Sequence, residues 1–151
     1  MVKAYKLLIG SIGDDSHSVG MALLKIAFRE AGFYVKHLGI LNTLDDFFYK
    51  AEDFDAIFIS CMNGHVDLYL EDFPRKLSTF QLGNSRPRVW YLGGNLSVQD
   101  DEETVIRRYL GMGFDYVAPK PVSWDVIYDR LMKDFHLKGI KKKGVPHADE
   151  D

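Results

Sequence analysis

The sequence has few of the features that mark secreted, membrane or nucleic-acid-binding proteins. Its 151 residues include one cysteine, Cys61, which excludes an internal disulfide and suits a reducing compartment. No apolar run approaches a membrane span, and the run that follows Lys3 and Lys6 ends at Asp14, too early for a signal peptide. The net charge of −3 gives no reason to expect binding to nucleic acid or to an anionic membrane. We expect a cytoplasmic protein that binds neither nucleic acid nor a membrane.

Apolar and aromatic residues, in contrast, are plentiful. They make up 46% and 13% of the chain, which predicts a packed globular fold of a single domain. Only the end of the chain departs from this composition, with a lysine run at 141–143 and an acidic end at 149–151. The sequence therefore predicts one domain over residues 1–137 and a mobile charged tail over residues 138–151.

Strand and helix patterns alternate along the domain. Continuous apolar strands separated by helices predict an α/β fold with a parallel sheet, right-handed crossovers and helices on both faces. The common arrangement of five such strands is the doubly wound, flavodoxin-like (Rossmann-like) sheet of order 2-1-3-4-5. The predicted strands cover 5–12, 33–38, 56–60, 88–92 and 116–118, and the predicted helices cover 19–31, 44–51, 66–82, 100–112 and 123–135. In the first helix, Val19, Leu23, Ile26, Ala27 and Phe28 are expected to form the buried face.

Three loops of this fold carry unusual residues. In the predicted order, the carboxyl ends of the first, third and fourth strands lie side by side, and ligands bind at such a switch point. The first strand leads into a turn at 13–20, the third into 60–64, and the fourth into Gly93, Gly94 and Asn95. Because glycine has no Cβ, the glycine pair lets a ligand approach the backbone closely.

The first of these loops holds a histidine, His17, between Gly13 and Gly20. A histidine on such a loop can point its ring into the crevice above the sheet, and Asp15 can hold the other ring nitrogen. A lone histidine on a surface loop is more often solvated than a ligand, and only the glycine-bounded loop at the switch point makes the two interpretations of His17 equally consistent. His65 follows the third strand and is a second histidine that can line a site at this edge.

Two other functions of the same fold fit less well. Receiver domains of two-component signalling place an acidic pair after the first strand and Lys-Pro after the fifth, as Asp14-Asp15 and Lys120-Pro121 do here. Such a domain also needs an aspartate at the end of the third strand, where this chain has Ser60. A flavin mononucleotide site is disfavoured because the acidic pair repels phosphate. A nucleophilic role for Cys61 lacks an evident base.

Asp15-x-His17-x-x-Gly20, Ser60-x-Met62 and Gly93-Gly94 together resemble the signature of cobalamin-binding domains, Asp-x-His-x-x-Gly, Ser-x-Leu and Gly-Gly. The motifs occur in the same order and on the same three loops. The resemblance extends to about residue 137 and is closest to the small (sigma) subunit family of glutamate mutases. Met62 in place of leucine is a nearly volume-conserving departure, and Gln99 stands where the pattern has glycine.

The resemblance implies a role for each motif residue. His17 would be the lower axial ligand of cobalt in place of the cofactor's dimethylbenzimidazole (base-off/His-on), with Asp15 holding its other nitrogen. Ser60, Cys61 and Met62 would line a slot for the displaced nucleotide tail, and Gly93 and Gly94 would leave it space. The complete set implied to contact the cofactor is Asp14, Asp15, Ser16, His17, Ser18, Gly20, Ser60, Cys61, Met62, Gly93, Gly94, Asn95, Leu96, Ser97, Val98 and Gln99.

The resemblance also implies an activity. The chain would be the cofactor-binding component of an adenosylcobalamin-dependent isomerase that converts L-glutamate to 3-methylaspartate by radical chemistry. A larger barrel-type catalytic subunit would supply the substrate cavity and complete a heterotetramer. This chain alone would bind cobalamin without turnover, and its only catalytic residue would be the cobalt ligand His17. A non-catalytic corrinoid carrier or sensor, which would share the same binding loop, remains the alternative.

Overall fold

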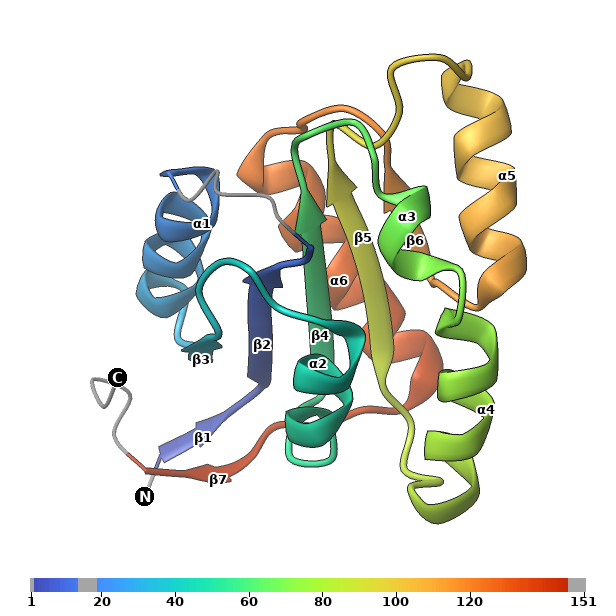
Figure 1. Cartoon of the computed structure of the whole chain (residues 1–151). Helices are drawn as coiled ribbons and strands as arrows, with labels where there is room; N and C mark the ends of the chain where they lie inside the picture. Colours follow the sequence, from blue (N-terminus) through green and yellow to red (C-terminus); the bar gives the residue numbers. More distant parts are fainter. Residues whose placement is uncertain (1, 14–18, 147–151) are drawn as a thin grey trace.

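A five-stranded parallel sheet in the order β3-β2-β4-β5-β6 forms the centre of the molecule (Figure 1). The computed structural model describes residues 2–13 and 19–146, with only the backbone of Val19. The strands are β2 (Lys6–Ser11), β3 (Tyr34–His37), β4 (Ala56–Cys61), β5 (Val89–Gly94) and β6 (Tyr116–Ala118). This arrangement confirms the predicted order 2-1-3-4-5, since β2 is the first predicted strand. In the register, Ser60 lies opposite both Ser11 and Gly93.

Helices cover both faces of the sheet, as predicted. One face carries α1 (Val19–Glu30) and α6 (Trp124–Lys138), and the other carries α2 (Leu44–Ala51), α3 (Asp67–Leu70), α4 (Phe73–Gly83) and α5 (Glu102–Met112) (Figure 1). Strand side chains alternate between the two layers. Along β4, Ile57, Ile59 and Cys61 enter the core under α2–α5, whereas Ala56 and Phe58 enter the core under α1 and α6.

The prediction for the buried face of α1 is wrong in part. Leu23 and Ile26 are 62% and 51% exposed, and the helix packs on the sheet through Phe28 with Met21 and Leu24. The helix has apolar residues around most of its circumference, so the sequence contains two overlapping apolar stripes. Contact with α6 and the sheet selects one of them.

Local chemistry sets the neighbouring element boundaries. Thr43 is the N-cap of α2 and forms a capping box with Asp46. Asn42, directly before this cap, donates through Nδ2 to the carbonyls of Ser11 and Gly39, both at 3.0 Å. The helix predicted over 66–82 is divided into α3 and α4, with Pro74 in the first turn of α4, where its missing N–H costs nothing.

The two ends of the chain pair with each other. Strand β1 (Val2–Ala4) runs antiparallel to β7 (Lys143–Val145), and Val145 and Ile140 are buried. The prediction that the chain does not pack from residue 138 on is therefore wrong as far as residue 146, while residues 147–151 lie outside the described part. Composition could not reveal this pairing, because it joins segments about as far apart in the sequence as the chain allows.

No helix in the described part of the chain combines the length and the apolarity needed to cross a membrane.

Candidate functional site

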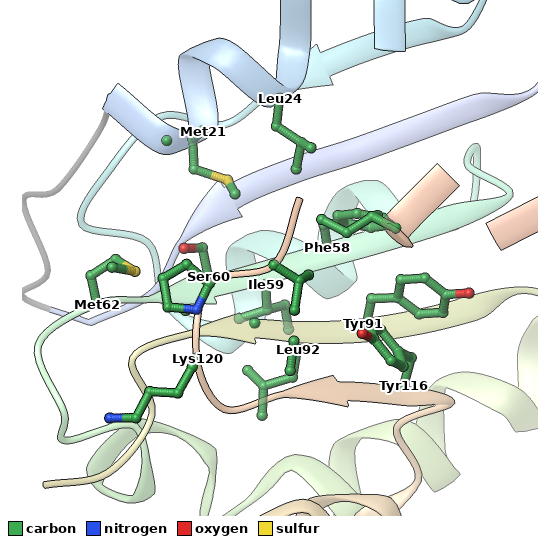
Figure 2. Close-up of a pocket in the computed structure, with 17 residues that line it drawn as sticks. Met21, Leu24, Phe58, Ile59, Ser60, Met62, Tyr91, Leu92, Tyr116 and Lys120 are labelled. Carbon is green, nitrogen blue, oxygen red and sulfur yellow. The ribbon is translucent and has the colours of Figure 1, made fainter. Parts of the chain in front are cut away.

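An apolar pocket of about 330 Å³ opens at the carboxyl ends of β4, β5 and β6, between the sheet and helices α1 and α6 (Figure 2). Phe58, Tyr91 and Tyr116 lie at its deep end. Ser60 and Met62 lie toward the ends of the strands, at its mouth. The pocket is thus at the carboxyl edge of the sheet, as the sequence predicts, but it spans the third to fifth predicted strands rather than the first, third and fourth. Its volume falls in the range of about 300–1,000 Å³ typical of small-molecule sites.

The strand pattern explains which side chains reach the pocket. Phe58, Ser60 and Met62 alternate along β4 and its loop, so all three face α1 and α6. Gly93 pairs with Ser60 and lines the same wall. A Cβ built on Gly93 would meet nothing closer than the Cβ of Ala118 at 3.8 Å. The absent side chain of Gly93 therefore leaves space that a larger residue would occupy.

Backbone hydrogen bonds connect the loops that form the mouth. The N–H of Asn95 donates to the carbonyl of Cys61 at 2.9 Å, and the carbonyl of Asn95 accepts from Gly64 at 2.9 Å. The N–H of Leu96 donates to the carbonyl of Pro119 at 3.2 Å. These bonds join the loops after β4, β5 and β6 into one framework around the pocket.

Five of the residues predicted to bind the cofactor line this pocket: Gly20, Ser60, Met62, Gly93 and Gly94. The predicted residues Asp14, Asp15, Ser16, His17 and Ser18 lie outside the described part of the chain. The structure does, however, describe both ends of their loop. Gly13 follows β2 and donates to the carbonyl of Asn42 at 2.7 Å, and Gly20 lines the pocket.

Other predicted residues lie elsewhere. Cys61 and Leu96 are buried in the core on the opposite face of the sheet, and the Cys61 thiol donates to Oδ1 of Asn63 at 3.1 Å. Ser97 accepts through Oγ from the N–H groups of Gln99 and Asp100, which makes it a turn residue. Val98 and Gln99 are exposed beside this turn. Asn95 does not line the pocket, but its Oδ1 accepts from Lys120, which does. His65 is exposed and is absent from the pocket wall.

Sequence reasoning missed the walls that come from the helices and from β6. Met21 and Leu24 of α1, Ile127 of α6, and Lys120 with the two residues after it all line the pocket. Lys120-Pro121 was a visible signal, because it follows the fifth strand of the predicted sheet. Lys-Pro at this place is a feature of receiver domains, and the same position after β6 also places it at the ligand edge.

A polar network supports the deep end of the pocket. The Tyr91 hydroxyl donates to Oδ2 of Asp134, which also accepts from Nε of Arg130 at 3.1 Å. The Arg130 guanidinium lies 5.1 Å from the centre of the Tyr116 ring. Burial, and next the hydrogen bond to Asp134, raises the pKa of Tyr91 far above its usual value. Tyr91 therefore stays neutral and serves as a fixed aromatic wall.

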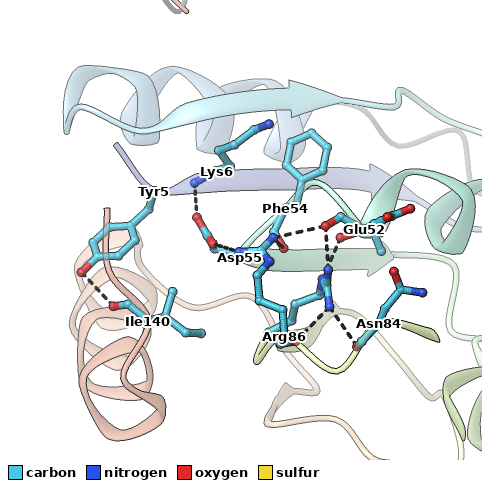
Figure 3. Close-up of polar contacts among 10 residues, drawn as sticks. Tyr5, Lys6, Glu52, Phe54, Asp55, Asn84, Arg86 and Ile140 are labelled. Atoms are coloured by element: carbon cyan, nitrogen blue, oxygen red, sulfur yellow. Dashed lines mark hydrogen bonds and ion pairs between the residues drawn. The ribbon is translucent and has the colours of Figure 1, made fainter. Parts of the chain in front are cut away.

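Asp55, the acidic residue directly before β4, lies at the amino end of that strand and has a structural role there. Asp55 is 2% exposed, accepts from the Lys6 N–H at 2.8 Å and forms an ion pair with Arg86 at 2.6 Å (Figure 3). The carboxyl end of β4 carries Ser60 and Cys61. This placement agrees with the argument against a phosphorylated aspartate at that edge.

A family model described as "B12 binding domain" matches residues 5–120. The chain belongs to the B12-binding domain family. Its curated relatives include proteins named glutamate mutase sigma subunit. The one from Treponema denticola is 32% identical over 138 residues, covering 89% of this chain and 97% of the relative. Those from Halobacterium salinarum and Carboxydothermus hydrogenoformans are 35% and 33% identical, covering 87% and 90% of this chain and 87% and 99% of the relatives.

Solved structures agree with the fold. A cobalamin-binding protein from Desulfitobacterium hafniense superposes with a TM-score of 0.61 at 19% identity, over 85% of this chain. This chain spans 58% of that protein's chain. The RPS4 and RRS1 TIR domain heterodimer gives a TM-score of 0.57 at 14% identity, covering 88% of this chain and 97% of that one. At these sequence identities the similarity shows the architecture alone, and proteins of many functions share this architecture.

Proposed function

We propose that this chain is the cobalamin-binding small subunit of an adenosylcobalamin-dependent carbon-skeleton mutase, in which a partner subunit converts L-glutamate to 3-methylaspartate. The observation that carries the proposal is the apolar pocket beside Gly93, at the carboxyl edge of the sheet in a chain that belongs to the B12-binding family. The alignments with the sigma-subunit relatives span most of each relative and most of this chain, which supports the glutamate mutase assignment.

The residues of the pocket fit a nucleotide tail. Its deep end offers aromatic surfaces from Phe58, Tyr91 and Tyr116, against which a benzimidazole ring packs well. The missing side chain of Gly93 leaves width for the ribose beside Ser60. We infer that the tail inserts here with its base withdrawn from cobalt, so the chain would bind the cofactor in the base-off state.

The vacated cobalt position needs a ligand from the protein. The loop that holds His17 and Asp15 starts at the end of β2 and ends at Gly20 in the pocket wall, so its anchors flank the mouth. We propose that His17 would hold the cobalt and that Asp15 would accept from the other ring nitrogen and orient the ring. When bound, adenosylcobalamin supplies a cobalt–carbon bond whose homolysis initiates the rearrangement. This chain holds and orients that cofactor.

The catalytic subunit would face the same edge of the sheet. Four large apolar side chains are exposed in the segments that follow β3, β4 and β5, three of them in loops and Leu68 in α3: Ile40 (38%), Leu41 (60%), Leu68 (68%) and Val98 (65%). Exposed apolar side chains that gather around a ligand site commonly mark an interaction surface. We name these four residues the rim and propose that the larger, barrel-type subunit covers the rim together with the corrin ring.

Visible absorption spectroscopy with adenosylcobalamin tests the binding step. The protein alone is expected to take up the cofactor with the spectral change of base displacement, and electron spin resonance of the reduced form should show coupling between cobalt and a histidine nitrogen. With the larger subunit added, 3-methylaspartate should form from L-glutamate. Absence of any uptake contradicts the proposal. Uptake with methyl transfer but no isomerisation assigns the chain to the corrinoid carriers instead.

A further inference from the structure

One cation stands at the mouth of an otherwise uncharged pocket. Among the described residues that line the pocket, Lys120 is the only one with a charged side chain. Figure 2 shows it at the strand-end side, with its ammonium group directed away from Tyr91 and Tyr116. We infer that Lys120 binds the phosphodiester of the corrinoid's nucleotide tail and makes the pocket select corrinoids that carry this tail. The inference rests on the proposed function and concerns what recognises the cofactor.

The ammonium group is held in place by the loops around it. Nζ of Lys120 donates to Oδ1 of Asn95 at 2.9 Å. Asn95 is itself fixed through its backbone to Cys61 and Gly64, and Pro119, directly before Lys120, accepts from the loop after β5. A lysine side chain normally loses much rotational freedom when it binds an anion, and here the contact with Asn95 has already reduced that cost.

The charge of Lys120 is not neutralised within the described part of the chain. Its partner, Asn95, is a neutral amide, and none of the carboxylates described there lies within ion-pair distance of Nζ. The Nδ2 group of Asn95 donates to no group in the same part of the chain. The mouth therefore presents an ammonium and an amide N–H₂ side by side, both of which donate to an anionic oxygen.

The chemistry of a corrinoid tail matches this arrangement. A complete tail carries an aromatic base, then a ribose, then a single phosphodiester that leads back to the corrin ring. With the base against Phe58 and Tyr91 and the ribose beside Gly93, the phosphodiester comes to lie at the mouth, next to Lys120. A compact ammonium binds phosphate as a point charge, and among the described residues that line the pocket Lys120 alone carries a charge that can provide the attraction.

The experiment compares two corrinoids on the full chain. Dissociation constants are measured by visible absorption for cobalamin and for cobinamide, which lacks the phosphodiester, ribose and base. Lys120→Met is expected to weaken cobalamin binding about tenfold, the loss of one charge-assisted hydrogen bond, and to leave cobinamide binding unchanged. Lys133→Met, which removes an exposed lysine of α6 that does not line the pocket, should change neither.

A second arm isolates the phosphate from the rest of the tail. Calorimetry should show that the wild-type chain binds α-ribazole phosphate more tightly than α-ribazole, and that this preference falls with added salt. Both the preference and its salt dependence should disappear in Lys120→Met. Circular dichroism melting of each variant establishes that the fold is retained.

Three results would overturn the inference. Equal weakening of cobalamin and cobinamide would mean that Lys120 acts on the corrin or on the fold. Unchanged binding of both would mean that Lys120 is merely solvated. If the wild-type chain takes up no corrinoid at all, the proposed function fails and this inference fails with it. In the first two cases the wild type still takes up cobalamin, so they overturn only the role of Lys120 and leave the proposed function intact.

Discussion

Gly93 and Gly94 end β5 for two different physical reasons. Gly94 has φ of +134°, and a Cβ there would lie 2.2 Å from the carbonyl oxygen of Cys61, so no side chain fits without moving the loops apart. Gly93 has room for a small side chain, but that room belongs to the pocket. The backbone therefore demands a glycine at position 94, whereas at position 93 we propose that the demand comes from the ligand.

Substitutions should separate these two roles. Gly94→Ala is expected to lower the free energy of unfolding by about 2 kcal/mol because of strain and the clash with Cys61. Gly93→Leu should unfold close to the wild type but bind cobalamin much more weakly than it binds cobinamide. Urea denaturation and absorption titration provide the two measurements. Gly111→Ala, in open space on α5, is the control and should be neutral or slightly stabilising. If Gly93→Leu binds cobalamin normally, the tail does not enter this pocket.

His17 and Asp15 carry the prediction that depends most on the sequence motif. His17→Ala should remove the nitrogen coupling from the spin resonance spectrum of the reduced cofactor. Asp15→Asn should keep that coupling but weaken cobalamin binding about 10- to 100-fold, because it disturbs the orientation of the ligand ring. His65→Ala is the control, since His65 is exposed outside the pocket wall. An unchanged spectrum in His17→Ala would remove His17 from the cobalt site.

At the scale of elements, the packing of α1 against β3 carries a pH dependence. Burial, and next the charges of Lys25 and Arg29, lower the pKa of His37 below its usual value of 6.5. The unfolded chain therefore binds this proton more tightly than the folded chain. The stabilisation associated with neutral His37 is fully present above about pH 6.5 and is lost as the pH falls toward the lowered folded-state pKa.

Denaturation as a function of pH checks this coupling. The free energy of unfolding of the wild type should decline between about pH 6.5 and pH 5 more steeply than that of His37→Gln, whose side chain does not titrate in that window. His136→Gln removes an exposed histidine of α6 and should keep the wild-type slope. Equal slopes for wild type and His37→Gln would show that α1 and β3 do not disfavour the charged ring.

Sequence periodicity predicted the five strands of the central sheet because each strand is an apolar run bounded by turn residues, and the common arrangement of five such strands predicted their order. The same alternation separates Ser60 and Met62 from Cys61, which β4 directs to the opposite core, so that distinction was available from the sequence. The buried stripe of α1 was not available, because Leu23 and Leu24 are equally apolar and only packing decides between them. The wall formed by α6 likewise depends on tertiary contact.

At the scale of the whole molecule, the two ends of the chain are joined below the sheet. The β1–β7 pair and the contact of Tyr5 with Ile140, whose carbonyl accepts from the Tyr5 hydroxyl at 3.4 Å, lie near the amino ends of the strands (Figures 1 and 3). The pocket lies at the carboxyl ends. The molecule thus divides into a closed, structural edge and an open edge that carries the pocket and the exposed apolar rim.

The rim contains a residue whose conformation is difficult to explain by stability. Leu41 has φ of +64°, a left-handed conformation that costs a leucine roughly 1–2 kcal/mol, and yet its side chain is 60% exposed. Asparagine tolerates that conformation better, so Leu41→Asn should stabilise the isolated chain slightly.

If the rim contacts the catalytic subunit, the same substitution, combined with Leu68→Asn, should weaken assembly and mutase activity while cobalamin binding by the isolated chain persists. Leu82→Asn, 89% exposed on α4 and outside the rim, is the matched control. Sedimentation of the mixed subunits measures the assembly, and unchanged assembly in the double variant would place the partner on another face.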